Sequence, residues 1–166
     1  MLVSFTQTLT LAATQQDVWN LLRDTKRLAA LIPGIKDIAQ VGVDGGDRGD
    51  AQEKHVARVV ERIGPFRLSL NLEVRIVQAV EPFLLQAELN GADHLVQNRL
   101  SGTLRAELKE TASAGTLLSM DSSVEVTGKL AALGAAPIRR RANELFTQFA
   151  DCLQGQFSSA GKQSTP

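Results

Sequence analysis

Apolar and polar residues alternate along most of the chain, which is the pattern of β-strands with one buried face. The longest alternation runs from Phe66 to Val77. One side carries Phe66, Leu68, Leu70, Leu72, Val74 and Ile76, and the other carries Arg67, Ser69, Asn71, Glu73 and Arg75. This alternation is typical of a sheet with one solvated face. Similar patterns predict strands over residues 3–11, 35–43, 52–62, 83–90, 96–108 and 116–127.

Three segments have helical spacing instead. Residues 14–23 begin with Thr14, which can cap a helix, and with Asp17 at the capping-box position. Residues 26–31 predict a second, short helix. Near the end of the chain, apolar residues recur at spacings of four and three, which predicts a long amphipathic helix in which Pro137 sits in the first turn or introduces a kink. Its apolar stripe consists of Ile138, Ala142, Leu145, Phe149 and Leu153.

The order of these elements predicts an α+β helix-grip fold. A long antiparallel sheet twists and curls, and its apolar face must be covered. The last helix is the only element long enough to cover it. We expect one domain over residues 1–157, with a disordered polar tail over residues 158–166. A curved sheet around one helix leaves a cavity, and the two short helices would lie at one end of it.

The apolar stretch Leu28–Ile35 belongs to the mouth of this predicted cavity. Leu28, Leu31 and Ile32 would face the opening, and Pro33-Gly34 would end the second helix. The proline–glycine pair has two compatible interpretations, a helix stop alone or a helix stop that also gates a ligand.

Apolar side chains would line the cavity, as in most sites for lipophilic molecules. The predicted lining is Leu28, Leu31, Ile32, Leu68, Leu70, Leu72, Leu104, Met120, Leu145 and Phe149. Three polar residues, His55, Glu61 and Asn98, would also face inward if their strands are oriented that way. His55 and Glu61 could then orient a carbonyl group of the ligand. The alternative, that both lie on a solvated strand edge, is the one the sequence favours.

The amino-acid composition and the spacing of the histidines argue against several classes of function. Eighteen basic and eighteen acidic residues cancel, so no basic face for nucleic acid is expected. A single cysteine, Cys152, excludes an intrachain disulfide and a cysteine metal cluster. Neither His55 nor His94 has further ligands at metal-like spacing, so we predict no metal site. Without a signal peptide or an apolar run of membrane-spanning length, a reducing cytoplasmic setting is expected.

Arg139, Arg140 and Arg141 form the one run of like charge. Consecutive helical residues point about 100° apart, which favours a solvated helix start over a single tight patch. The alternative is contact with anionic lipid headgroups or an acidic partner, with Lys129 extending the basic rim.

Five motifs in order make the chain resemble the CoxG-like family of carbon monoxide dehydrogenase subunits, within the START/Bet v 1-like (SRPBCC) superfamily. They are Asp17-Val-Trp-Asn-Leu-Leu-Arg-Asp24, Leu31-Ile-Pro-Gly34, Ile63-Gly-Pro65, Glu81-Pro82 and Gly128-Lys-Leu-Ala-Ala-Leu-Gly134. The resemblance implies a non-catalytic accessory protein that binds a lipophilic molecule such as a quinone. It also implies recruitment of a molybdenum-containing dehydrogenase to the cytoplasmic membrane, with peripheral membrane contact.

Two other functions fit the same fold. Some helix-grip relatives are polyketide cyclases or dehydratases, which need polar groups facing one another in the cavity. The cavity could instead be filled by side chains, which would leave an interaction module. Fold alone does not decide among them.

Overall fold

The computed structural model describes residues 1–45, 51–93 and 97–163, and only the backbone of residues 41–45, 51–52 and 158–163. Seven strands form one sheet in the order β1-β7-β6-β5-β4-β3-β2. All neighbouring strands are antiparallel. The strands are β1 (Leu2–Leu11), β2 (Ile35–Gly45), β3 (Ala51–Ile63), β4 (Phe66–Val80), β5 (Leu84–Asp93), β6 (Asn98–Glu110) and β7 (Thr116–Thr127).

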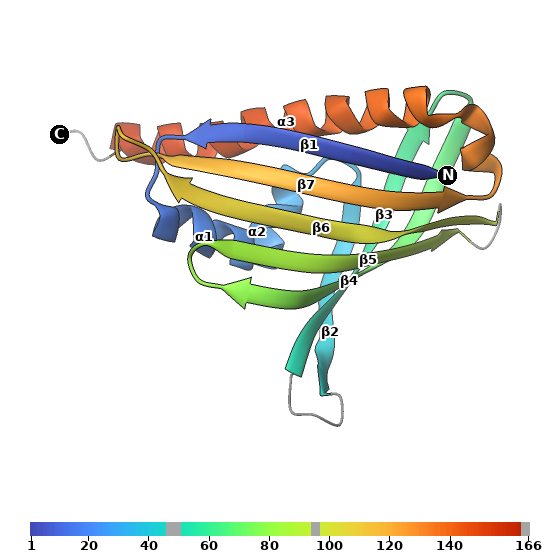
Figure 1. Cartoon of the computed structure of the whole chain (residues 1–166), viewed down its shortest axis with the longest axis horizontal. Coiled ribbons are helices and arrows are strands. Elements are labelled where there is room, and N and C mark those ends of the chain that lie inside the picture. The colour runs from blue at the N-terminus through green and yellow to red at the C-terminus, as the bar shows by residue number, and fades with distance from the viewer. Residues whose placement is uncertain (46–50, 94–96, 164–166) are drawn as a thin grey trace.

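Helices lie on one side of this curved sheet (Figure 1). Helices α1 (Gln15–Arg23) and α2 (Thr25–Leu31) follow β1, and a short 3-10 helix, η1 (Lys129–Leu133), precedes α3 (Ala135–Gln163). α3 runs beside β1 and also approaches β3 and η1. The helix-grip fold predicted from the sequence is therefore confirmed. α3 continues beyond the domain boundary expected at residue 157.

Local signals set the boundaries of the short helices. The Thr14 side chain accepts a hydrogen bond from the backbone N–H of Asp17 at 3.1 Å, which caps the start of α1. Asp24 then serves two helices. Its backbone N–H donates to Asn20 and Leu21 at the end of α1, and its carboxylate accepts from the Arg27 N–H at the start of α2. One residue thus ends one helix and begins the next.

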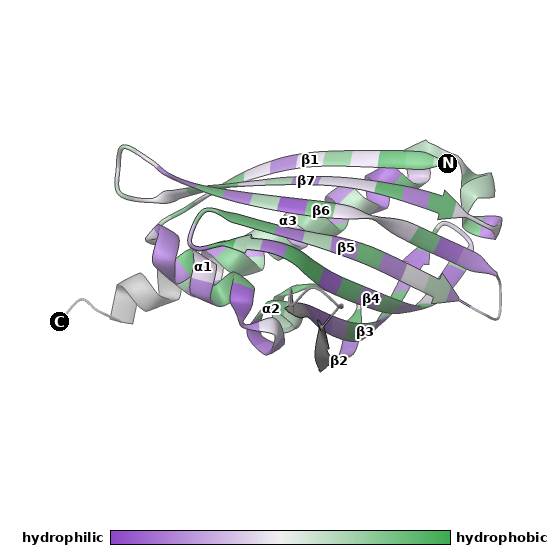
Figure 2. Cartoon of the chain, turned by 60° about the horizontal axis from the view of Figure 1, so that its bottom comes forward, coloured by the Kyte–Doolittle hydropathy of each residue, from purple (hydrophilic) through white to green (hydrophobic). Residues whose placement is uncertain are grey.

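Residues directly opposite each other in antiparallel strands project to the same face, so strand register identifies the face toward α3. Val3 and Val124 are opposite each other and pack in a core cluster with Ile138 of α3. The same row continues across the sheet through Gly102, Leu89, Val74 and His55. We call the side that carries this row the inner face. Figure 2 shows hydrophilic and hydrophobic residues alternating along the strands.

Two separate core clusters hold α3 against the inner face. The first joins β1, α1, β6, β7 and the second half of α3, and its buried residues include Leu11, Trp19, Leu118, Phe149 and Leu153. The second joins β1, β4, β7, η1 and the first turns of α3, and consists of Val3, Leu68, Val124, Val126, Leu130 and Ile138. The apolar stripe of α3 is therefore divided, since Ile138 belongs to one cluster and Phe149 and Leu153 to the other.

Candidate functional site

The inner face between the two core clusters has a different composition from the clusters themselves. Five apolar residues there are only half-buried, although their side chains project toward the helices: Leu72, Val74, Ile76, Leu89 and Leu104. The same rows contain Ala57, Ala87, Gly91, Gly102 and Ser122, which are small. We call these ten residues, together with His55, the central inner face. It is an apolar wall that the described core clusters do not include.

Helix α3 presents small and half-buried residues over the same stretch. Ala142 and Leu145 lie between Ile138 and Phe149 on the stripe, and both are half-buried. Phe146 packs against Phe149 with the ring centroids 6.3 Å apart. Ile138 and the stretch from Phe149 to Leu153 belong to the two core clusters, and Ala142 and Leu145 lie between them.

The predicted lining residues divide between packed core and half-buried positions. Leu68 and Phe149 are buried in core clusters, and Leu70 is buried as well. Leu28, Leu31, Ile32 and Met120 are partly buried against the first cluster. Leu72 and Leu104 lie on the central inner face, and Leu145 is half-buried on α3.

His55 faces inward and is buried, with 4% of its surface exposed. The sequence favoured a solvated strand edge for this residue, and its burial excludes that. Its Nε2 lies 3.4 Å from Oε2 of Glu53, which is two residues away on the same side of β3. Glu53 Oε1 in turn accepts a hydrogen bond of 2.5 Å from Nη2 of Arg23, in the last turn of α1. A chain of polar contacts therefore connects Arg23 of α1, Glu53 and His55. Sequence reasoning missed Arg23 and Glu53.

Glu61 also faces inward, but its carboxylate forms an ion pair with Arg141 of α3. Arg141 of α3 donates to Glu61 through Nε at 2.8 Å and through Nη2, and donates to Glu144 at 2.9 Å. The hydrogen bonds that Arg141 donates to Glu61 first, and then to Glu144, raise the pKa of its guanidinium above the ordinary value. The Glu61 carboxylate thus joins β3 to α3 and is held by a permanent cation.

Asn98 is buried next to η1. Its Oδ1 accepts a hydrogen bond of 2.9 Å from the backbone N–H of Leu130 in η1. A Cβ on Gly128 would lie 2.8 Å from the same oxygen. Asn98 therefore fixes the turn that leads from β7 into η1. His94, the second histidine of the chain, lies outside the described residues.

The arginine run splits in the structure. Arg139, Arg140 and Lys129 are exposed, whereas Arg141 is half-buried and paired. Arg140 and Arg141 line a half-open hollow of about 470 Å³ together with Arg62, Ile63, Gly64, Pro137 and Glu144. Arg62 pairs in register with Arg67 across the β3–β4 hairpin, so two further arginines lie at this end of the molecule. The long sequence separation between this hairpin and α3 hid both arginines from a search for charge runs.

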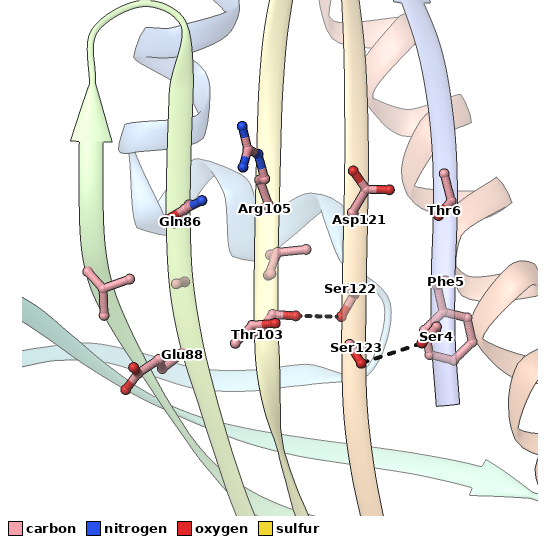
Figure 3. A pocket seen from close by; sticks show the side chains of 13 residues that line it. Ser4, Phe5, Thr6, Gln86, Glu88, Thr103, Arg105, Asp121, Ser122 and Ser123 are labelled. Carbon is pink, nitrogen blue, oxygen red and sulfur yellow. Dashed lines mark hydrogen bonds between the residues drawn. The ribbon is translucent and has the colours of Figure 1, made fainter. Parts of the chain in front are cut away.

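Two other half-open hollows lie over the sheet. The larger, of about 560 Å³, spans β1, β7, β6 and β5 (Figure 3). Most of its polar side chains occupy the positions that alternate with the inner-face rows: Ser4, Thr6, Gln86, Glu88, Thr103, Arg105, Asp121 and Ser123. The second, of about 520 Å³, has Asn71, Glu73, Asn90 and Arg99 in its lining. Both are therefore depressions of the outer face that mix polar and apolar side chains.

Within the described residues, no group of three His, Cys, Asp or Glu side chains is arranged to hold a metal ion. None of the helices in the described parts of the chain combines the length and apolar character that a membrane span requires.

Solved structures share this architecture. A conserved protein from Geobacillus kaustophilus superposes with a TM-score of 0.78 at 20% identity, covering 96% of this chain and 97% of that one. A START superfamily protein from Mycobacterium smegmatis gives a TM-score of 0.67 at 19% identity, with coverages of 95% and 98%. Ara h 8.0201 gives 0.65 at 14% identity, with coverages of 96% and 99%. These likenesses show the fold.

The family is identified from the sequence itself. A comparison with curated proteins finds no match. The family model for the carbon monoxide dehydrogenase subunit CoxG matches residues 8–158, which is nearly the whole chain. The match confirms the resemblance drawn from the five motifs: the chain belongs to the CoxG family of carbon monoxide dehydrogenase subunits and has the START-like fold.

Proposed function

We propose that this chain is a non-catalytic accessory protein that holds a lipophilic molecule, such as a quinone, between the central inner face and α3. One observation carries the proposal. The two core clusters pack separate stretches of α3, while the wall between them combines half-buried large apolar residues with small residues. Each buried CH₂ group contributes about 0.8 kcal/mol, so an acyl or isoprenoid chain could be held by this wall with few polar contacts.

The direct experiment is solvent extraction of the purified protein followed by mass spectrometry. A lipophilic molecule at near-stoichiometric amount would support the proposal and identify the ligand. If the extract is empty, ubiquinone and menaquinone analogues are added back and their binding is measured by titration. A protein that binds none of them would contradict the carrier function.

A variant that fills the proposed space gives a sharper test. Ala87 is buried on the inner face between Leu104 and Ile76. We expect Ala87→Phe to weaken binding of the lipophilic molecule at least tenfold, because the added ring would occupy its place. Ala92→Phe is the matched control, since Ala92 lies on the outer face of the same strand. Titration of the two folded variants with the lipophilic molecule compares their affinities. Equal affinities would place the ligand elsewhere.

The second part of the proposed function is recruitment. In keeping with the family, we propose that the chain brings a molybdenum-containing dehydrogenase to the membrane by peripheral contact. Exposed Lys129, Arg139 and Arg140 support this, because cations near a surface attract anionic headgroups and acidic partners.

A cyclase- or dehydratase-like enzyme is the second candidate function. The buried His55 beside Glu53 favours it, since a histidine oriented by a carboxylate is a common acid–base arrangement. Turnover of a polyketide-like substrate that His55→Phe abolishes would support it.

A further inference from the structure

His55 contains a buried polar atom that the proposed function has not explained. Within the described residues, Nδ1 of this ring has no accessible surface and no hydrogen-bond partner. Buried polar groups in folded proteins are nearly always paired, and each unpaired one is unfavourable. A ligand group that paired with Nδ1 would therefore gain binding energy that an apolar group could not.

The neighbours of His55 determine which kind of group that is. A carboxylate only accepts hydrogen bonds, so the contact between Nε2 and Glu53 places the ring proton on Nε2. Arg23 donates a hydrogen bond of 2.5 Å to the other carboxylate oxygen, Oε1, which fixes the orientation of the Glu53 side chain beside the ring. In a neutral imidazole one nitrogen donates and the other accepts, so Nδ1 is left as an acceptor.

The position of His55 connects this acceptor to the apolar wall. His55 lies directly opposite Val74, which is half-buried on the central inner face, and Ala57 follows it on the same side of β3. His55 therefore lies beside the half-buried residues of the inner face. A lipophilic molecule lying along Val74 would have one end next to this ring.

We propose that the ligand carries a hydroxyl group that donates a hydrogen bond to Nδ1 of His55, so that the site selects lipophilic alcohols and phenols over the corresponding ethers and carbonyls. For a quinone and its hydroquinone, the reduced form would bind more tightly. Glu53 and Arg23 act as positioning residues, because they fix the tautomer without touching the ligand. This inference rests on the proposed lipophilic carrier function.

The test compares two probes that differ only in the donor, 4-nonylphenol and its methyl ether 4-nonylanisole, by titration at pH 8. We expect the phenol to bind the wild-type protein roughly tenfold more tightly, as one added hydrogen bond allows. His55→Phe should abolish the difference. Glu53→Gln should reduce or reverse it, because the amide can donate to Nε2 and make Nδ1 the donor. Glu73→Gln on the outer face is the matched control and should keep the preference.

The outcomes separate this inference from the proposed function. If both probes bind the wild-type protein equally, hydroxyl selection is wrong and the carrier function stands. If neither probe binds and quinone analogues also fail, both are wrong. Long-range ¹H–¹⁵N NMR of the wild-type ring gives a reading that needs no variant, and the chain has only two histidines to assign. A proton found on Nδ1 of the neutral ring would overturn the inference.

Discussion

Gly34 shows at the residue scale why the Leu31-Ile-Pro-Gly34 turn has its sequence. Its φ is 85°, in the region that favours glycine. A Cβ there would lie 2.7 Å from Oε2 of Glu61 and 2.8 Å from the carbonyl oxygen of Val60. We expect Gly34→Ala to lower the free energy of unfolding by about 1–3 kcal/mol, through backbone strain and this close approach. Urea denaturation measures the loss.

Gly155 of α3 is the control for that substitution. It is exposed in a helix, and a Cβ would meet no heavy atom within 4 Å. Gly155→Ala should leave the free energy of unfolding unchanged or raise it by up to about 1 kcal/mol. If the two variants are equally stable, the turn does not require glycine.

The sequence predicted part of the role of Gly34 and could not predict the rest. A proline–glycine pair after an apolar stretch indicates a helix stop, which is what the structure has at the end of α2. The approach of Glu61 and Val60 to Gly34 depends on the pairing of β2 with β3, where the Val60 N–H donates to the Gly34 carbonyl at 2.8 Å. Local sequence carries no signal for such a contact.

Arg141 of α3 joins this helix to β3 through its ion pair with Glu61. Loss of the Arg141 side chain should therefore weaken the packing of the two elements. The Glu61 side chain is 11% exposed and the Arg141 side chain 28%, so the pair lies between the surface and buried classes of ion pair. We expect Arg141→Gln to lower the free energy of unfolding by about 1–3 kcal/mol, because it leaves a poorly solvated carboxylate without its cation. Arg140→Gln, one residue away and exposed, should change it by less than about 0.5 kcal/mol. Thermal or urea unfolding of the two variants compares them, and similar losses would refute the special role of Arg141.

The three arginines look alike in the sequence, and only the fold distinguishes them. The helical geometry of α3 was enough to predict that they do not form one patch. Glu61 lies 80 residues away in the chain, so nothing local identified Arg141 as its partner. In the same way, Arg62 became part of the basic hollow only through the position of the β3–β4 hairpin.

At the scale of the whole molecule, the alternation of side chains was sufficient to predict the architecture. A strand that alternates needs one cover, and a chain with a single long amphipathic helix offers one way to provide it. The division of the inner face was not predictable in this way. Leu68 and Leu72 are equivalent in the pattern, yet Leu68 is packed in a core cluster and Leu72 is half-buried. That difference depends on where α3 crosses the sheet, which the alternation does not encode.

The exposed basic residues of η1 and of the first turns of α3 should control how the whole molecule binds a membrane. Each cation near an anionic surface contributes about 1 kcal/mol, so replacing Lys129, Arg139 and Arg140 with Gln should weaken binding to phosphatidylglycerol-containing vesicles by about a hundredfold at low salt. Replacing exposed Lys26 and Arg27 of α2 with Gln is the control and should have a smaller effect. Vesicle co-sedimentation measures both. Equal losses would indicate attraction by total charge alone, and no loss in the triple variant would exclude this end of the molecule as the membrane contact. The affinity for the lipophilic ligand should stay unchanged in both variants, because neither alters the central inner face.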